Sequence, residues 1–143
     1  MKGRWLGIGL FWGVCLFVYH TCSIRWNLTE SLPYKVFLGS TLFSEYKVGD
    51  VISFKHPKFQ APLAKIIVGV PGDKVSVKDG SIYVKSINRG KVLLEKHPPI
   101  QNQTIPHGHF FVWTEHPESF DSRYQPIGLI KQEDILEKLW PLF

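Results

Sequence analysis

The sequence predicts a mostly β protein in which a single N-terminal membrane helix precedes a compact β domain. Two observations carry this prediction. No Lys, Arg, Asp or Glu occurs between Arg4 and Arg25, and after Trp26 short runs rich in β-branched and aromatic residues alternate with turn residues. With 143 residues, the chain has room for one core besides this segment. We therefore divide it into a cytoplasmic N-terminus with a transmembrane anchor, residues 1–25, and an extracytoplasmic domain, residues 26–143.

The N-terminal segment has the flanks and the length of a membrane anchor. A helix needs about 20 residues to cross a bilayer, which the uncharged segment supplies. Lys2 and Arg4 precede it, so the positive-inside rule places the N-terminus in the cytoplasm. A cleavable signal peptide is one alternative, because the uninterrupted apolar core, residues 5–18, has only about 14 residues, and a soluble buried helix is another. We favour a retained anchor, because the bulky side chains of residues 19–23 make a poor cleavage site.

The remaining chain is punctuated like an antiparallel β protein. The predicted strands are residues 34–38, 51–55, 64–70, 74–78, 81–85, 91–95 and 110–113. Asp79-Gly80 predicts a tight hairpin, and residues 88–90 predict a second hairpin with a longer loop. In the tail, residues 132–136 fit one helical turn, and residues 136–142 fit a last strand.

Composition and motifs exclude several classes of function. The net charge is +5, but the basic residues are scattered and no nucleic-acid-binding signature accompanies them, so we expect no nucleic-acid partner. Motifs of phosphate-binding loops, zinc peptidases and redox dithiols are missing. His107 and His109 would share one face of a strand, but two ligands do not make a metal site. We therefore expect neither a metal nor a cofactor.

Lys65 stands out because apolar residues flank it on both sides in a predicted strand. Burial would lower the pKa of its amine, which is the condition under which a lysine can serve as a general base toward a serine hydroxyl. An edge-strand lysine whose amine stays in water is the alternative. The residues alone leave both readings open.

Four stretches resemble, in order, the sequence boxes of type I signal peptidases, the membrane-bound Ser-Lys endopeptidases. They are residues 29–33 (TESLP), 48–54 (VGDVISF), 65–75 (KIIVGVPGDKV) and 108–124, which ends in SFDSRY. The third and the end of the fourth are the most specific. The sequence departs from these boxes at two places: residues 31–33 read Ser-Leu-Pro, and Trp113-Thr114 replaces the usual Gly-Asp. In both it resembles the conjugative-transfer branch of TraF-like pilin peptidases. How that wall of the site is supported stays open.

The resemblance implies a role for each site residue. Ser31 would be the nucleophile and Lys65 its neutral general base. The backbone N–H of Ser31 and the hydroxyl of Thr29 would hold the oxyanion. The supporting residues would be Ser119, which orients the lysine amine, and Asp121 and Arg123, an ion pair that braces the site.

The implied function is endopeptidase processing of exported precursors, with pilin maturation in conjugative transfer, possibly with cyclisation, as the favoured case. One alternative is a general signal peptidase I that removes secretory signal peptides, and another is a non-catalytic membrane-anchored assembly subunit with the same fold. The expected partners are a membrane-inserted precursor and the lipid bilayer. The expected location is the bacterial inner (cytoplasmic) membrane, single-pass, with the catalytic domain on the periplasmic side. Ser31 follows Ile24 by seven residues, at most roughly 25 Å, so it would act near the membrane surface.

Overall fold

The computed structural model describes residues 2–27, 32–93 and 97–143, with the side chains described from residue 7 onward. The elements are, in chain order, α1 (Lys2–Thr21), β1 (Cys22–Trp26), β2 (Val36–Ser40), β3 (Val51–Phe54), β4 (Leu63–Gly69), β5 (Lys74–Lys78), β6 (Ser81–Val84), β7 (Ile87–Lys91), β8 (Gln103–Thr104), β9 (His109–Trp113), β10 (Ile130–Lys131), η1 (Gln132–Asp134) and β11 (Ile135–Pro141). The prediction of a mostly β chain with one N-terminal helix is confirmed.

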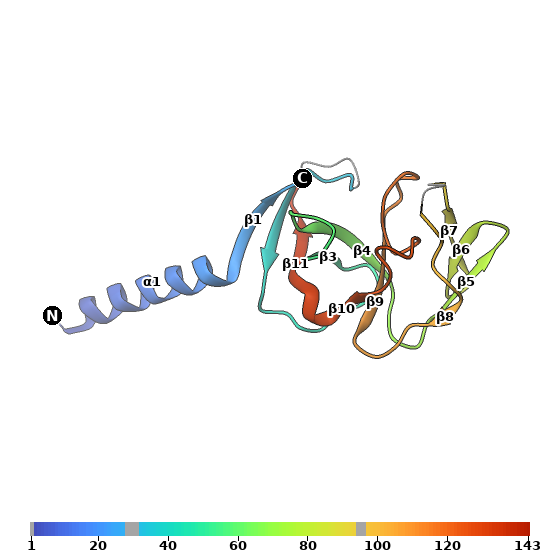
Figure 1. Ribbon diagram of the computed structural model, residues 1–143. Coiled ribbons are helices and arrows are strands. Elements are labelled where there is room, and N and C mark those ends of the chain that lie inside the picture. Colours follow the sequence, from blue (N-terminus) through green and yellow to red (C-terminus); the bar gives the residue numbers. More distant parts are fainter. Residues whose placement is uncertain (1, 28–31, 94–96) are drawn as a thin grey trace.

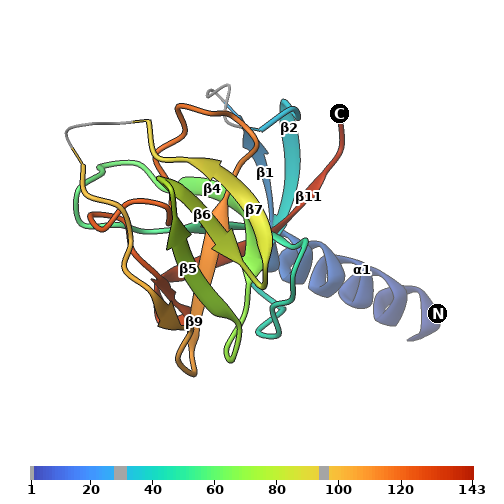
Figure 2. The ribbon, with the colours of Figure 1, turned by 90° about the vertical axis from the view of Figure 1, so that its right-hand side faces the viewer.

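The described strands form two antiparallel sheets. The larger has the order β1-β2-β11-β3-β4-β9-β10, and the smaller has the order β7-β6-β5-β8. In Figure 1 the small sheet lies at the end of the domain opposite α1. Figure 2 shows β5, β6 and β7 of the small sheet in front of β4 and β9 of the large one. Val68 of β4 belongs to the same buried apolar cluster as Val75 and Ile82 of the small sheet, so the two sheets meet at the strand that carries Lys65.

The helix α1 projects from the β domain and leads directly into β1 (Figure 1). Residues 22–25, expected within the anchor, instead form an edge strand, in register with β2 from Cys22↔Ser40 to Trp26↔Val36. Among the residues that the structure describes, no helix is long and apolar enough to cross a membrane. The predicted transmembrane anchor is therefore not confirmed.

The strand β1 is held in place by a buried carboxylate of β11. Arg25 forms an ion pair with Glu137, with Nη2 at 2.6 Å from Oε1, and Ser23 donates a hydrogen bond to the same carboxylate at 3.0 Å. These bonds pass over β2 at Gly39, where an added Cβ would collide with the carboxylate of Glu137 and the hydroxyl of Ser23. A glycine at this position therefore lets the first and last strands bond across the strand between them.

One of the two predicted hairpin turns is confirmed. Asp79 and Gly80 join β5 to β6 with φ values of 49° and 74°. The second turn lies at Lys85 (φ 53°) and Ser86 (φ 65°), so the prediction of a loop at residues 88–90 is wrong, and those residues lie within β7. Both turns have two central residues with positive φ, the geometry that matches the twist of the paired strands.

The tail and the shortest strands complete the large sheet. The predicted helical turn and last strand are confirmed as η1 and β11, and β11 inserts between β2 and β3. The two-residue strands β8 and β10 were not predicted, because two residues are too few to show an alternating pattern.

The core covers β4 and β9 on both faces. Ile67 and Val112, which pair across these strands, belong to one apolar cluster. Val68 and Phe111 belong to a second cluster, which includes residues of the small sheet. A side chain in the middle of β4 is therefore surrounded by protein whichever way it points.

We expect Gly69→Ala to destabilise the protein by about 1–3 kcal/mol. An added Cβ would lie 2.6 Å from Cδ1 of Ile105 and 2.9 Å from Cγ1 of Val84, at the contact between the two sheets. Urea unfolding measures the loss, with Ile87→Ala, at an exposed position of β7, as the control that changes little. An unchanged unfolding midpoint for Gly69→Ala would show that the sheets do not meet closely here.

Candidate active site

Lys65 lies in the interior of the large sheet. Its strand, β4, runs between β3 and β9, and Lys65 is paired with Ile52 of β3. The residue is 4% exposed. The alternative of an edge-strand lysine with its amine in water is therefore wrong.

Burial sets the charge state of the Lys65 amine. It lowers the pKa from its usual 10.5 to about 8, because the charged form is poorly solvated. Asp121 acts in the opposite direction and Arg123 adds to the lowering. At pH 7 about one amine in ten is then neutral, a usable fraction for a general base.

The structure brings Ser119 to Lys65, as the resemblance implies. The Nζ of Lys65 donates a hydrogen bond to the Oγ of Ser119 at 2.7 Å, and the contact is buried. The two residues are 54 positions apart in the sequence. The hydroxyl therefore fixes one direction of the amine inside the protein.

Asp121 and Arg123 form a fully buried, two-pronged ion pair. The Nε and Nη2 atoms of Arg123 each lie 2.9 Å from one carboxylate oxygen of Asp121. Arg123 Nη2 also donates to the backbone carbonyls of His116 and Ser119, both at 3.1 Å, and the backbone N–H of Thr114 donates to Asp121 at 3.3 Å. The pair therefore holds the loop that presents Ser119 to Lys65.

The small sheet contacts Trp113, which stands where the resemblance implies a glycine. The indole N–H of Trp113 donates to the backbone carbonyl of Arg89 in β7 at 2.7 Å. The Arg89 guanidinium lies 5.3 Å from the centre of the Trp113 ring. Sequence reasoning missed Arg89, because nothing in the local pattern of residues 87–91 indicates a contact with β9.

Lys65 lines a pocket of about 300 Å³ that is mainly apolar. Its walls come from β1, β2, β3, β4, β11 and the segment before β4; the lining residues are Arg25, Trp26, Asn27, Phe37, Ser53, Ala61, Pro62, Leu63, Ala64, Lys65 and Leu139. An extended chain with small side chains could lie here beside the lysine amine.

The predicted nucleophile Ser31 and oxyanion residue Thr29 lie outside the described residues, but the flanks of their segment are described. The side-chain amide of Asn27 donates to the carbonyls of Leu32, at 3.2 Å, and Tyr34, at 2.9 Å. Asn27 itself lines the pocket beside Lys65. The chain on both sides of residues 28–31 is therefore tied together at this pocket.

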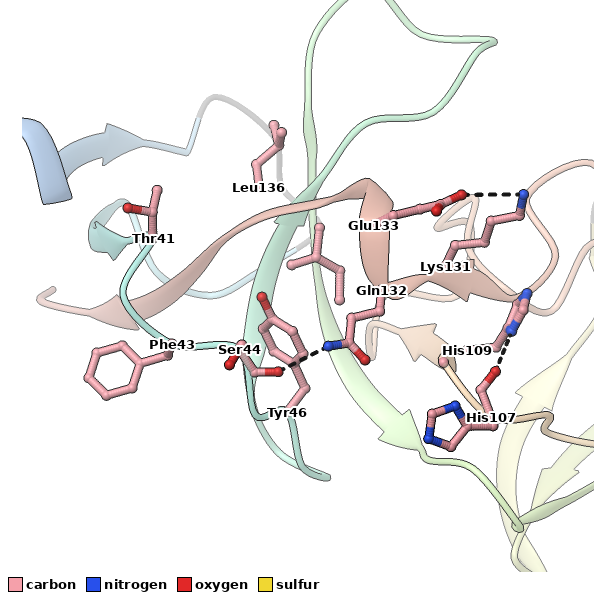
Figure 3. A pocket seen from close by; sticks show the side chains of 12 residues that line it. Thr41, Phe43, Ser44, Tyr46, His107, His109, Lys131, Gln132, Glu133 and Leu136 are labelled. Carbon is pink, nitrogen blue, oxygen red and sulfur yellow. Dashed lines mark hydrogen bonds and ion pairs between the residues drawn. The ribbon is translucent and has the colours of Figure 1, made fainter.

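A second, more open pocket of about 730 Å³ lies between residues 41–46, 107–109 and 131–136, and none of the predicted catalytic or supporting residues lines it. Figure 3 shows its wall, with the Nδ1 of His109 3.0 Å from the carbonyl of His107. Within the described part of the chain, no three His, Cys, Asp or Glu side chains gather as a metal site would require.

The chain matches a protein family and solved structures. A family model described as "Signal peptidase, peptidase S26" matches residues 4–141. One solved structure among the matches, a signal peptidase I from Enterococcus faecalis, is 24% identical, with 67% of this chain and 97% of that chain covered and a TM-score of 0.46. No curated protein sequence matches.

We expect Asp121→Asn to destabilise the fold by about 3–5 kcal/mol, because Arg123 would keep a buried charge without its partner. Thermal or urea unfolding measures the loss. The control is Glu133→Gln, which makes the same carboxylate-to-amide change in the exposed ion pair with Lys131. It should cost less than about 1 kcal/mol. Equal effects of Asp121→Asn and Glu133→Gln would contradict a bracing role for the buried pair.

Proposed function

Because the chain belongs to the signal peptidase family, and is therefore a serine endopeptidase of the signal peptidase I type, we propose that Ser31 and Lys65 are its catalytic dyad. The observation that carries this proposal is the buried amine of Lys65, whose pKa is lowered to about 8 beside an apolar pocket. Leu32, which directly follows Ser31, is buried in a cluster with Phe37 and Leu139. Phe37 and Leu139 also line the pocket of Lys65.

The proposed reaction is acyl transfer through a covalent intermediate. The Oγ of Ser31 attacks the scissile carbonyl carbon while its proton passes to the neutral amine of Lys65. The backbone N–H of Ser31 and the hydroxyl of Thr29 donate to the oxyanion that forms. The C–N bond then breaks as Lys65 returns the proton to the leaving amine. Water then attacks the acyl-enzyme as Lys65 takes its proton, and the ester bond to the Oγ of Ser31 breaks as Lys65 passes this proton to that oxygen, which releases the second product.

The supporting residues keep the base in place during this cycle. Ser119 accepts one N–H of the Lys65 amine. The ion pair of Asp121 and Arg123 holds the loop of Ser119 and places one charge of each sign near the amine, so that burial dominates its pKa. Asp121 and Arg123 therefore act through Lys65 rather than on the substrate.

The proposed substrates are exported precursors that carry a signal peptide, with pilin subunits of a conjugation apparatus as the favoured case. The Ser-Leu-Pro sequence at residues 31–33 and Trp113-Thr114 in place of Gly-Asp support the pilin case. If a peptide amine instead of water resolves the acyl-enzyme, the product is cyclic. Mass spectrometry of the mature product distinguishes the two, because a cyclic product is one water lighter than the linear one.

Membrane attachment through α1 is part of the proposal. The signal peptidase I family is generally membrane-associated. Apolar side chains are exposed around the described part of α1; they include Leu10, Phe11, Trp12, Leu16 and Phe17. These exposed apolar side chains favour an apolar environment around α1. We place α1 in the bacterial inner membrane and the β domain on its periplasmic side, and alkaline carbonate extraction of cell membranes would release the chain if α1 is not embedded.

We expect Ser31→Ala and Lys65→Ala each to lower the rate of processing of a signal-peptide-bearing precursor by about 100- to 10,000-fold. Gel analysis of precursor and product over time measures the rate. Lys78→Ala, which removes an exposed lysine at the end of β5, is the matched control and should process at the wild-type rate. Wild-type rates for Ser31→Ala or Lys65→Ala would reject the proposed dyad.

We expect kcat/KM to rise with pH, with a midpoint near 8, and to level off above it. Only the neutral amine of Lys65 accepts a proton, and its pKa of about 8 means that the amine is mostly charged below this pH. Steady-state rates between pH 6 and about 10 give the profile. A flat profile over this range would exclude Lys65 as the base.

A further inference from the structure

Thr114 is a buried residue that the proposed reaction does not use. It is fully buried, and its hydroxyl oxygen has no hydrogen-bond partner among the described residues. An unsatisfied buried hydroxyl costs about 1–3 kcal/mol. Valine has nearly the same shape without this cost. Packing alone therefore does not explain a hydroxyl at residue 114.

The strand β9 ends at Trp113, and its register with β4, extended by one residue, predicts that Thr114 lies on the same face as Lys65. Ile67 of β4 pairs with Val112 of β9, and the neighbouring pair is Ile66↔Trp113. Lys65 precedes Ile67 by two positions and Thr114 follows Val112 by two, and residues two apart on a strand point to the same face. The extended register would set Thr114 opposite Lys65, and the backbone N–H of Thr114 donates to Asp121, whose charge acts on the Lys65 amine. The Cβ atoms of such a pair lie about 4.5–5.5 Å apart.

A neutral lysine amine has two N–H donors and one lone pair, and a general base must aim the lone pair at the nucleophile. Ser119 accepts one N–H of Lys65 at 2.7 Å. With the Cε–Nζ bond and one N–H fixed, the second N–H and the lone pair can still exchange places on the nitrogen. A second acceptor is needed to fix the direction of the lone pair.

We propose that Thr114 is a positioning residue for Lys65, whose hydroxyl accepts the second N–H of the amine, directly after a small rotation or through one water molecule. Ser119 and Thr114 together then aim the lone pair at the nucleophile. This inference rests on the proposed role of Lys65 as the base. It also gives a function to the threonine that stands where the family usually has aspartate.

The test compares Thr114→Val, which removes only the hydroxyl, with Thr114→Ser, which keeps it. Thr114→Val should lower kcat on a purified signal-peptide-bearing precursor about 10-fold, with KM little changed. The midpoint of the Lys65 titration should move to lower pH, because the charged amine loses an acceptor. Thr114→Ser should keep both values near wild type.

The titration of Lys65 is read without any substrate, from the NMR signal of its ε-carbon, assigned by its absence in Lys65→Ala. The charged groups that act on this amine, Asp121 and Arg123, are the same in every variant. Arg25 lines the same pocket but is paired with Glu137.

A second buried hydroxyl serves as the control. Ser122 is fully buried, and its Oγ accepts the backbone N–H of Val112 at 3.0 Å. Ser122→Ala should lower the melting temperature and leave the Lys65 midpoint unchanged. If Thr114→Val does not fold, Thr114→Ala takes its place.

A Thr114→Val protein that melts higher than wild type, with an unchanged Lys65 midpoint and unchanged kcat, would overturn the inference. The hydroxyl would then be an unpaired group in the core and nothing more. Failure of the dyad is a separate result, because active Ser31→Ala would reject the nucleophile without altering the Lys65 midpoint in Thr114→Val.

Discussion

A lysine amine loses its proton at a pH as low as about 8 only where the protein buries it, and the architecture around β4 meets this requirement. The strand lies inside the large sheet, with β3 on one side and β9 on the other. Apolar clusters cover both of its faces. Burying an amine lowers the stability of its charged form, so the surrounding core determines the chemistry of Lys65 as well as the stability of the fold.

The two sheets contribute differently to this site. The large sheet supplies Lys65, and the loop after β9 supplies Ser119, Asp121 and Arg123. The small sheet supplies no predicted catalytic residue, but β7 lies against the site through the carbonyl of Arg89, which accepts from the indole of Trp113. Gly90 lies so close to Arg123 that an added Cβ would be 3.2 Å from Nη1. The small sheet therefore shields the buried ion pair.

Local signals in the sequence predicted local structure well and distant contacts poorly. Asp79-Gly80 was readable as a turn because both residues accept positive φ, whereas Lys85 and Ser86 adopt the same geometry without that signal. The strand β1 was missed because its first residues continue the uncharged N-terminal segment, and the ion pair of Arg25 with Glu137 joins residues 112 positions apart.

In the candidate site, too, the sequence indicated local features better than distant contacts. The pattern around Lys65 indicated a buried strand but could not exclude an edge strand, since burial depends on which strands pair with it. The resemblance named Ser119 and the ion pair of Asp121 and Arg123, and the structure places them around the amine. The resemblance could not indicate the contacts of Trp113, because these depend on the position of β7.

The bonds that cross β2 at Gly39 also bear on the order in which the protein assembles. The strand β1, which precedes the segment of Ser31, is held by Glu137 of β11, and the backbone of Val36 bonds the residues that follow β11. Contacts so distant in sequence form late in folding, because the closure of a long loop must come first. During synthesis, the N-terminal part of the domain cannot acquire its native support until β11 has left the ribosome. Leu139 of β11 also lines the pocket of Lys65, so this pocket is incomplete in a nascent chain that lacks β11.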